Sequence, residues 1–157
     1  MKIFTPDNKP EQGRGKIDPY MKAIFLAGPT PRSNDVKGWR PEALDILENL
    51  GFDGIVYVPE RADWGVKFNY DDQIVWELNG LDYCNVIMFW VPRELPNMPA
   101  FTTNVEFGMN IKTGRVIYGR PDWAIHTKYL DTIYREYTRN EPCNTLKDTV
   151  EATLKAL

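Results

Sequence analysis

Cysteine, histidine and surplus basic charge are all scarce in this sequence. Its two cysteines, Cys84 and Cys143, lie far apart with no CxxC spacing, which argues against a disulfide framework or a zinc knuckle. The single histidine, His126, argues against a Ser-His-Asp triad and a histidine-rich metal site. The formal net charge of −3 leaves no basic excess to attract nucleic acid or an anionic membrane.

Long apolar runs are also missing. No stretch approaches the ~20 residues that a membrane-spanning helix needs, and residues 1–6 lack the apolar segment of a signal peptide. We therefore expect a cytoplasmic protein. A chain of 157 residues, 43% hydrophobic and 26% charged, suffices for one domain with a buried core.

Two regions differ in composition. Residues 1–20 are polar and rich in glycine and proline, which predicts an N-terminal arm that lies on the body or on a partner subunit. From residue 21 to 157 short apolar runs alternate with segments of helical spacing. The apolar runs predict strands within residues 22–28, 54–58, 85–91 and 115–119.

The helical segments fall between and after these runs. We predict helices within residues 39–52, 70–84, 102–114, 126–137 and 145–157, with Thr145 capping the last. In the second helix, Ile74, Val75, Leu78 and Leu81 are expected to form the buried face.

This alternation predicts a single flavodoxin-like or Rossmann-like α/β domain, with a mostly parallel sheet and helices on both faces. Ligands of such folds bind at the carboxyl ends of the strands. Residues 28–32, 59–64 and 92–101 should therefore meet at one edge, together with the start of the third helix.

Glu106, in the segment PAFTTNVEFGMN, has two interpretations. Thr103 and Glu106 have the spacing of a capping box, in which the glutamate only completes the helix end. Alternatively, a carboxylate in a helix's first turn is stabilised as the anion and can act in glycosyl transfer.

Other candidates also have structural alternatives. After the first strand, Arg32, Ser33 and Arg40 could reach a phosphate or carboxylate, or could simply be solvated. The loop has neither phosphate-binding fingerprint, GxGxxG or GxxxxGK[ST]. Glu77 fits an ordinary helix surface as well as a cleft, and Trp90 a core as well as a base-stacking surface.

Arg93 directly follows the third predicted strand. There it is expected to face the ligand edge.

Six segments, in this order, resemble the nucleoside 2-deoxyribosyltransferase-like family: IFLAGPTPR, WRPEAL, GFDGIVYVPE, WELNGL, FWVPR and PAFTTNVEFG. The similarity runs from about Ala23 to Asp122, and the order of the motifs is more specific than any one of them. The resemblance implies a glutamate nucleophile that attacks C1′ of a nucleoside, and VEFG puts this role on Glu106.

Further roles follow from the resemblance. Ala27, Gly28 and Pro29 match the family's loop beside sugar and base, and ELNG puts its base-contacting acid on Glu77. Gly108 matches the small residue that lets the helix pack close to the site.

Two family features are missing. Phe25 stands where transferases carry an aromatic hydroxyl, and only Thr102, Thr103 and Asn104 precede Glu106 where they carry an aspartate. We expect Glu77 and Asn104 to orient base and sugar, and Arg32 or Arg93 to meet a phosphate if one is present.

The resemblance implies an enzyme that cleaves or exchanges the N-glycosidic bond of a (deoxy)nucleoside or nucleotide, with no metal or organic cofactor. A free nucleobase could be the acceptor, and a homo-oligomer is expected. The alternatives are a hydrolase of nucleoside 5′-monophosphates and an inactive nucleotide-binding or sensing module.

Overall fold

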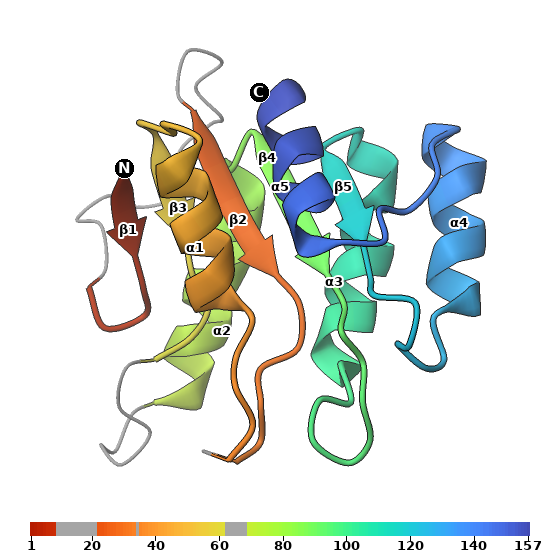
Figure 1. Cartoon of the computed structure of the whole chain (residues 1–157). Helices are drawn as coiled ribbons and strands as arrows, with labels where there is room; N and C mark the ends of the chain where they lie inside the picture. Colours follow the sequence, from red (N-terminus) through yellow and green to blue (C-terminus); the bar gives the residue numbers. More distant parts are fainter. Residues whose placement is uncertain (9–21, 34, 62–68) are drawn as a thin grey trace.

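A parallel β-sheet forms the centre of the molecule. The computed structural model describes residues 1–8, 22–33, 35–61 and 69–157. Within them, five strands pair in the order β1-β3-β2-β4-β5, and every pairing is parallel. Figure 1 shows this sheet, whose strands are β1 (Lys2–Phe4), β2 (Ala23–Ala27), β3 (Ile55–Tyr57), β4 (Val86–Trp90) and β5 (Val116–Gly119).

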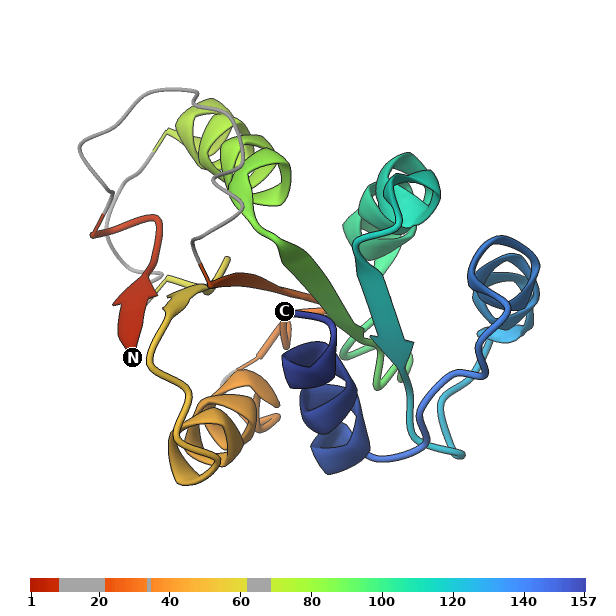
Figure 2. The same cartoon turned by 90° about the horizontal axis from the view of Figure 1, so that it is seen from above.

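Helices cover both faces of the sheet, as the view from above shows (Figure 2). One face packs against α1 (Arg40–Asn49) and α5 (Leu146–Lys155). The other packs against α2 (Tyr70–Tyr83), α3 (Phe101–Asn110) and α4 (Lys128–Thr138), with the short 3-10 turn η1 (Ile111–Thr113) after α3.

Side chains of the central strands alternate between these two layers. In β4, Ile87 and Phe89 face α3, while Met88 and Trp90 face α1 and α5. All five residues of β4 are buried, which explains why its sequence is continuously apolar rather than alternating. The predicted flavodoxin-like α/β fold is confirmed, and the sheet is parallel throughout the described part of the chain.

The N-terminal segment contributes to the sheet. Lys2–Phe4 forms the edge strand β1 beside β3, where the sequence predicts only a polar arm. Three residues are too short to show a strand period, so the pairing depends on the neighbouring edge rather than on local pattern. The rest of the predicted arm, residues 9–20, lies outside the described residues.

The predicted buried face of α2 is wrong for three of its four residues, whereas Leu81, at 2% exposed, is buried as predicted. Ile74, Val75 and Leu78 are 38%, 47% and 37% exposed. Instead, Trp76 packs against the sheet, with its ring centroid 6.4 Å from that of Phe25. Aliphatic residues on both sides of the helix made the choice of face ambiguous, and the large aromatic ring decides it because it buries more area.

The capping of α5 agrees with the sequence. Thr145 Oγ1 accepts a hydrogen bond from the backbone N–H of Asp148 at 3.0 Å.

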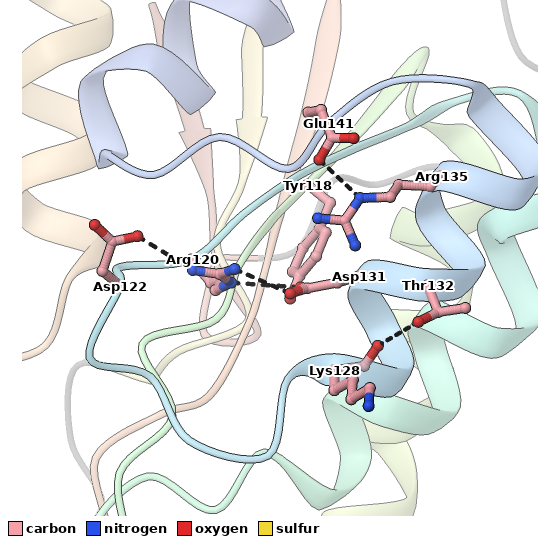
Figure 3. Close-up of polar contacts among 8 residues, drawn as sticks. All are labelled: Tyr118, Arg120, Asp122, Lys128, Asp131, Thr132, Arg135 and Glu141. Atoms are coloured by element: carbon pink, nitrogen blue, oxygen red, sulfur yellow. Dashed lines mark hydrogen bonds and ion pairs between the residues drawn. The ribbon is translucent and has the colours of Figure 1, made fainter.

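A polar cluster fixes α4 to the end of β5 (Figure 3). The buried Asp131 accepts hydrogen bonds from the Tyr118 hydroxyl at 2.9 Å and from Arg120 Nη2 at 3.0 Å. The two buried groups, Tyr118 and Asp131, therefore have partners, as buried polar groups require.

Among the described residues, no helix combines the length and apolar character that crossing a bilayer demands.

Candidate functional site

A cleft of about 260 Å³ lies at the carboxyl ends of β2, β3 and β4. The loop after β2 contributes Gly28, Pro29, Thr30 and Arg32 to its lining, and the chain after β3 contributes Pro59. From α1 and α2 it is lined by Arg40, Tyr70, Gln73 and Glu77, and from α3 and the two residues before it by Pro99, Ala100, Phe101, Thr102, Thr103 and Glu106. The predicted segments do converge at this edge, since residues from the β2 loop, the end of β3, the chain before α3 and α3 itself all line the cleft, while residues 62–64 of the prediction lie outside the described residues.

Close approach of the chain requires glycine at one point of the wall. A Cβ atom on Gly28 would lie 2.1 Å from the carbonyl oxygen of Trp90 and 2.8 Å from the Trp39 ring. Its φ of +150° is also one that other residues rarely adopt. Gly28 therefore lets the loop after β2 run directly over the end of β4.

The helix that carries Glu106 starts at Phe101, so Thr103 is not the N-cap residue that a capping box with Glu106 requires. Ala100 precedes α3 in the left-handed conformation, with φ 58°, and no side chain caps the helix. Thr103 is already inside the first turn and Glu106 lies one turn further on. The capping-box interpretation is wrong, and so is the expectation that Glu106 occupies the first turn.

Burial controls the ionisation of Glu106. Removal from water is the main cause that raises the pKa of Glu106, the charge of Glu77 raises it as well, and Arg40 lowers it, so that the pKa is about 8. A carboxyl group in a desolvated site beside a second carboxylate prefers to keep its proton. Glu106 and Glu77 therefore form a coupled pair, in contrast to the helix-stabilised anion that the sequence predicts.

Glu77 belongs to the same cleft and has its own partner. Burial raises the pKa of Glu77, while a hydrogen bond from Gln73 and the charge of Arg40 lower it. The Gln73 Nε2 group donates to Glu77 Oε1 at 2.9 Å. This bond holds one carboxylate oxygen of Glu77 and leaves the other for a ligand.

Arg40 is the cation that both carboxylates share. It is 2% exposed and lines the cleft, although it is the first residue of α1 and has the sequence context of a solvated helix end. Burial lowers the pKa of Arg40, and the negative charges of Glu60, Glu106 and Glu77 oppose this effect. An arginine side chain stays protonated in proteins, so a fixed positive charge lines the same cleft as the pair.

The cleft contains seven of the predicted site residues: Gly28, Pro29, Arg32, Glu77, Thr102, Thr103 and Glu106. Exposed Arg32 lies near its mouth, over the ring of Phe101 at 5.6 Å from the ring centroid. The other five, Ala27, Trp90, Arg93, Asn104 and Gly108, do not line it.

Arg93 and Asn104 bind each other. The Arg93 guanidinium donates to the side-chain oxygen of Asn104 and to the backbone oxygen of His126, so it joins α3 to the loop before α4. Arg93 is 5% exposed. Arg93 therefore holds two segments of the chain together and is not exposed to a ligand.

The remaining three residues have structural surroundings. Ala27 and Trp90 are buried in the two layers of the core. A Cβ atom on Gly108 would meet no heavy atom within 4 Å, so close helix packing does not explain a glycine there.

Two residues of the cleft, Arg40 and Gln73, are not identified as site residues by the family resemblance. The sequence leaves Arg40 open between a solvated and a ligand-binding role and predicts no role for Gln73. The signal for Gln73 is its spacing: it precedes Glu77 by four residues, which puts both side chains on one helix face. The signal for Arg40 appears only in the fold, since nothing local marks it as buried.

The fold and the cleft together define an α/β protein with a paired-carboxylate site at the carboxyl edge of a parallel sheet. Residues 21–122 match the family described as nucleoside 2-deoxyribosyltransferase like. Because this match covers most of the chain, the protein belongs to the nucleoside 2-deoxyribosyltransferase-like family.

Among solved structures, a conserved protein from Enterococcus faecalis V583 is similar to this chain, with a TM-score of 0.57 and 14% identity. The similarity covers 87% of this chain and 99% of that one, and at this identity it supports the fold alone. No curated protein matches the sequence.

Proposed function

We propose that this protein cleaves or exchanges the N-glycosidic bond of a nucleoside or nucleotide, with Glu106 as the nucleophile. The observation that carries the proposal is the pairing of Glu106 with Glu77 inside one cleft, where neither carboxylate has a capping role. Family membership supports N-glycosidic chemistry in this cleft. Two carboxylates in different surroundings suit the two roles of glycosyl transfer, nucleophile and proton donor.

The chemistry follows from the way the pair shares its protons. With a pKa of about 8 for Glu106, the cleft holds a proton at neutral pH, and the reactive form is the one in which that proton lies on Glu77. Glu106 then attacks C1′, the C1′–N bond breaks, and Glu77 protonates the departing base. Water or a second base next attacks C1′, returns a proton to Glu77 and releases Glu106.

A second candidate function is hydrolysis of a nucleoside 5′-monophosphate. The side chain of Arg32 and the uncapped first turn of α3 line the same cleft, and both suit a phosphate group. Thr102 and Thr103 add hydroxyl groups at this end. A nucleotide-binding module without catalysis is the third candidate, because the family's aromatic hydroxyl and its aspartate before the nucleophile are missing.

We also propose a homo-oligomer, joined through α2 and α3. Large apolar side chains recur every four residues on the outer faces of both helices, and they are all exposed: Tyr70, Ile74 and Leu78 on α2, and Phe101, Val105 and Met109 on α3. The two helices lie next to each other on one face of the sheet (Figure 2). Two adjacent apolar stripes suit burial against a second copy. Residence in the cytoplasm stays a prediction.

The test of the proposed function is a chromatographic screen of nucleosides and their 5′-monophosphates, each with and without a free acceptor base. Release of base without acceptor indicates hydrolysis, and exchange only with acceptor indicates transfer. Substrates with fluorine at C2′ in the arabino configuration slow breakdown of the intermediate. Intact-protein mass spectrometry should then show one added fluorosugar, which peptide mapping assigns to Glu106. Binding of nucleotide with no released base would instead support the binding module.

A further inference from the structure

Arg40 makes an unusual number of contacts for a buried side chain at a cleft. Its Nε donates to Leu26 O at 3.1 Å and its Nη2 to Gly28 O at 2.7 Å. Its Nη1 donates to Thr30 Oγ1 at 2.9 Å and to Glu60 Oε2 at 3.2 Å. These contacts use four of the five N–H groups of a guanidinium.

The contacts connect three elements that build the site. Leu26, Gly28 and Thr30 belong to the end of β2 and the loop after it, Glu60 follows β3, and Arg40 itself begins α1. Gly28 and Thr30 are also walls of the cleft. With four N–H groups engaged in this way, Arg40 is held in place and is poorly suited to move toward a phosphate.

We propose that Arg40 is a positioning residue that fixes the β2 loop and holds a positive charge in the cleft that Glu77 and Glu106 line, so that Glu106 can give up its proton. This inference rests on the proposed function for its catalytic meaning. Arg40 acts through the two carboxylates and the loop, and it makes no bond to the reacting atoms.

The charged and titratable groups around Glu106 come from every element at the cleft. The helix α2 contributes Glu77 and Tyr70, α1 contributes Arg40, and the β2 loop contributes Arg32. Glu60, which follows β3, is connected to the cleft by its bond to Arg40. Of the two cations, Arg32 is exposed and therefore screened by water, whereas Arg40 is buried. Arg40 is the cation that lowers the pKa of Glu106.

The experiment measures ionisation of Glu106 directly in the ligand-free protein, by NMR titration of 13C-labelled glutamate side chains, with Glu106→Gln for assignment. The reference protein is Glu60→Gln, because removing Arg40 alone would leave a charged Glu60 without its partner. In this background, Arg40→Gln should raise the titration midpoint of Glu106 by about one pH unit or more. Arg40→Lys should keep the midpoint near that of the reference, because the charge is retained.

A matched control removes a different arginine that binds carbonyl groups. Arg115 Nη1 donates to Leu81 O at 2.8 Å and to Cys84 O at 2.7 Å. Arg115 directly precedes β5, so it lies at the amino ends of the strands, away from the cleft at their carboxyl ends. Arg115→Gln should leave the Glu106 midpoint unchanged. If the Arg40→Gln variant fails to fold, Arg40→Met in the same background supplies the comparison, because methionine fills the buried space without charge.

An unchanged or lowered midpoint in the neutral variant would overturn the proposal, as would an equal rise in the lysine variant. The titration needs no substrate. Its result therefore separates failure of this inference from failure of the proposed function, which the turnover screen decides.

Discussion

Replacing Glu106 by glutamine should stabilise the protein at alkaline pH. Burial and, after it, the charge of Glu77 raise the pKa of Glu106 from its usual 4.5 to about 8, so the folded state holds this proton more tightly than the unfolded chain does. For a group raised in this way, its stabilising contribution is complete below pH 4.5 and disappears as the pH rises toward 8. Wild type should therefore lose stability across this range, whereas Glu106→Gln should lose less.

The size of the effect follows from the same values. Each tenfold change in proton affinity is worth about 1.4 kcal/mol, so the full shift corresponds to roughly 5 kcal/mol. Glu106 is half-buried and water reaches part of it, which reduces the expected gain. We expect Glu106→Gln to be more stable than wild type by roughly 2–4 kcal/mol at pH 9, and nearly equal to it at pH 4.5.

Urea unfolding at pH 4.5, 7 and 9 measures this difference. Glu48→Gln is the matched control, since Glu48 is an exposed glutamate on α1 away from the cleft, and it should show no such trend. A capping glutamate would give the opposite sign, because its loss destabilises a helix by about 1 kcal/mol. Equal or lower stability of Glu106→Gln at pH 9 would refute the desolvated-pair explanation.

Three further predictions concern substrate, proton donor and assembly. Arg32→Ala should weaken binding of a monophosphate substrate ten-fold or more and leave binding of the nucleoside unchanged, since a charged hydrogen bond is worth roughly 1.5–3 kcal/mol. Arg93→Ala should instead lower the melting temperature and change the activity toward both substrates alike. Glu77→Gln should lower the NMR midpoint of Glu106, because a neighbouring negative charge is removed, and should lower kcat because the proton donor is lost. Val105→Asp should convert the oligomer to a folded monomer in light scattering, because Val105 is 61% exposed in one chain.

Each of these has a result that contradicts it. Equal losses for nucleoside and nucleotide in Arg32→Ala would remove the phosphate role. If Glu77→Gln changes neither the titration midpoint of Glu106 nor kcat, Glu77 has no role in the site and is an ordinary helix-surface residue. For assembly, Tyr129→Asp is the control, since Tyr129 on α4 is 77% exposed and lies outside the two stripes. The same mass for wild type and Val105→Asp would exclude an interface at α3.

Much of the fold is readable in the sequence because its signals are local. The continuously apolar β4 requires helices on both sides, and the alternation of strand and helix requires parallel pairing. The signal for the start of α5 is equally local, since the N-cap residue Thr145 needs only the backbone N–H of Asp148, three residues later. The position of Glu106 near a strand end follows from the same pattern, as does its match to the family.

Tertiary structure decided the features that depend on distant partners. The start of α3 at Phe101, set by the left-handed Ala100, removes the capping role of Glu106 that its spacing with Thr103 suggests. Arg93 turns toward Asn104 instead of the cleft, since its partners come from α3 and the loop before α4.

The ionisation of the carboxylates in the cleft also depends on partners that are distant in the sequence. By itself the sequence determined that Glu106 stands near the ligand edge, because strand and helix periods place it there, while Glu77 fitted a helix surface as well as a cleft. Only the folded chain brings Glu77, Glu106 and Arg40 from three helices into one desolvated cleft. A pKa is set by burial and by the charges nearby in space, and neither is defined until these helices pack together.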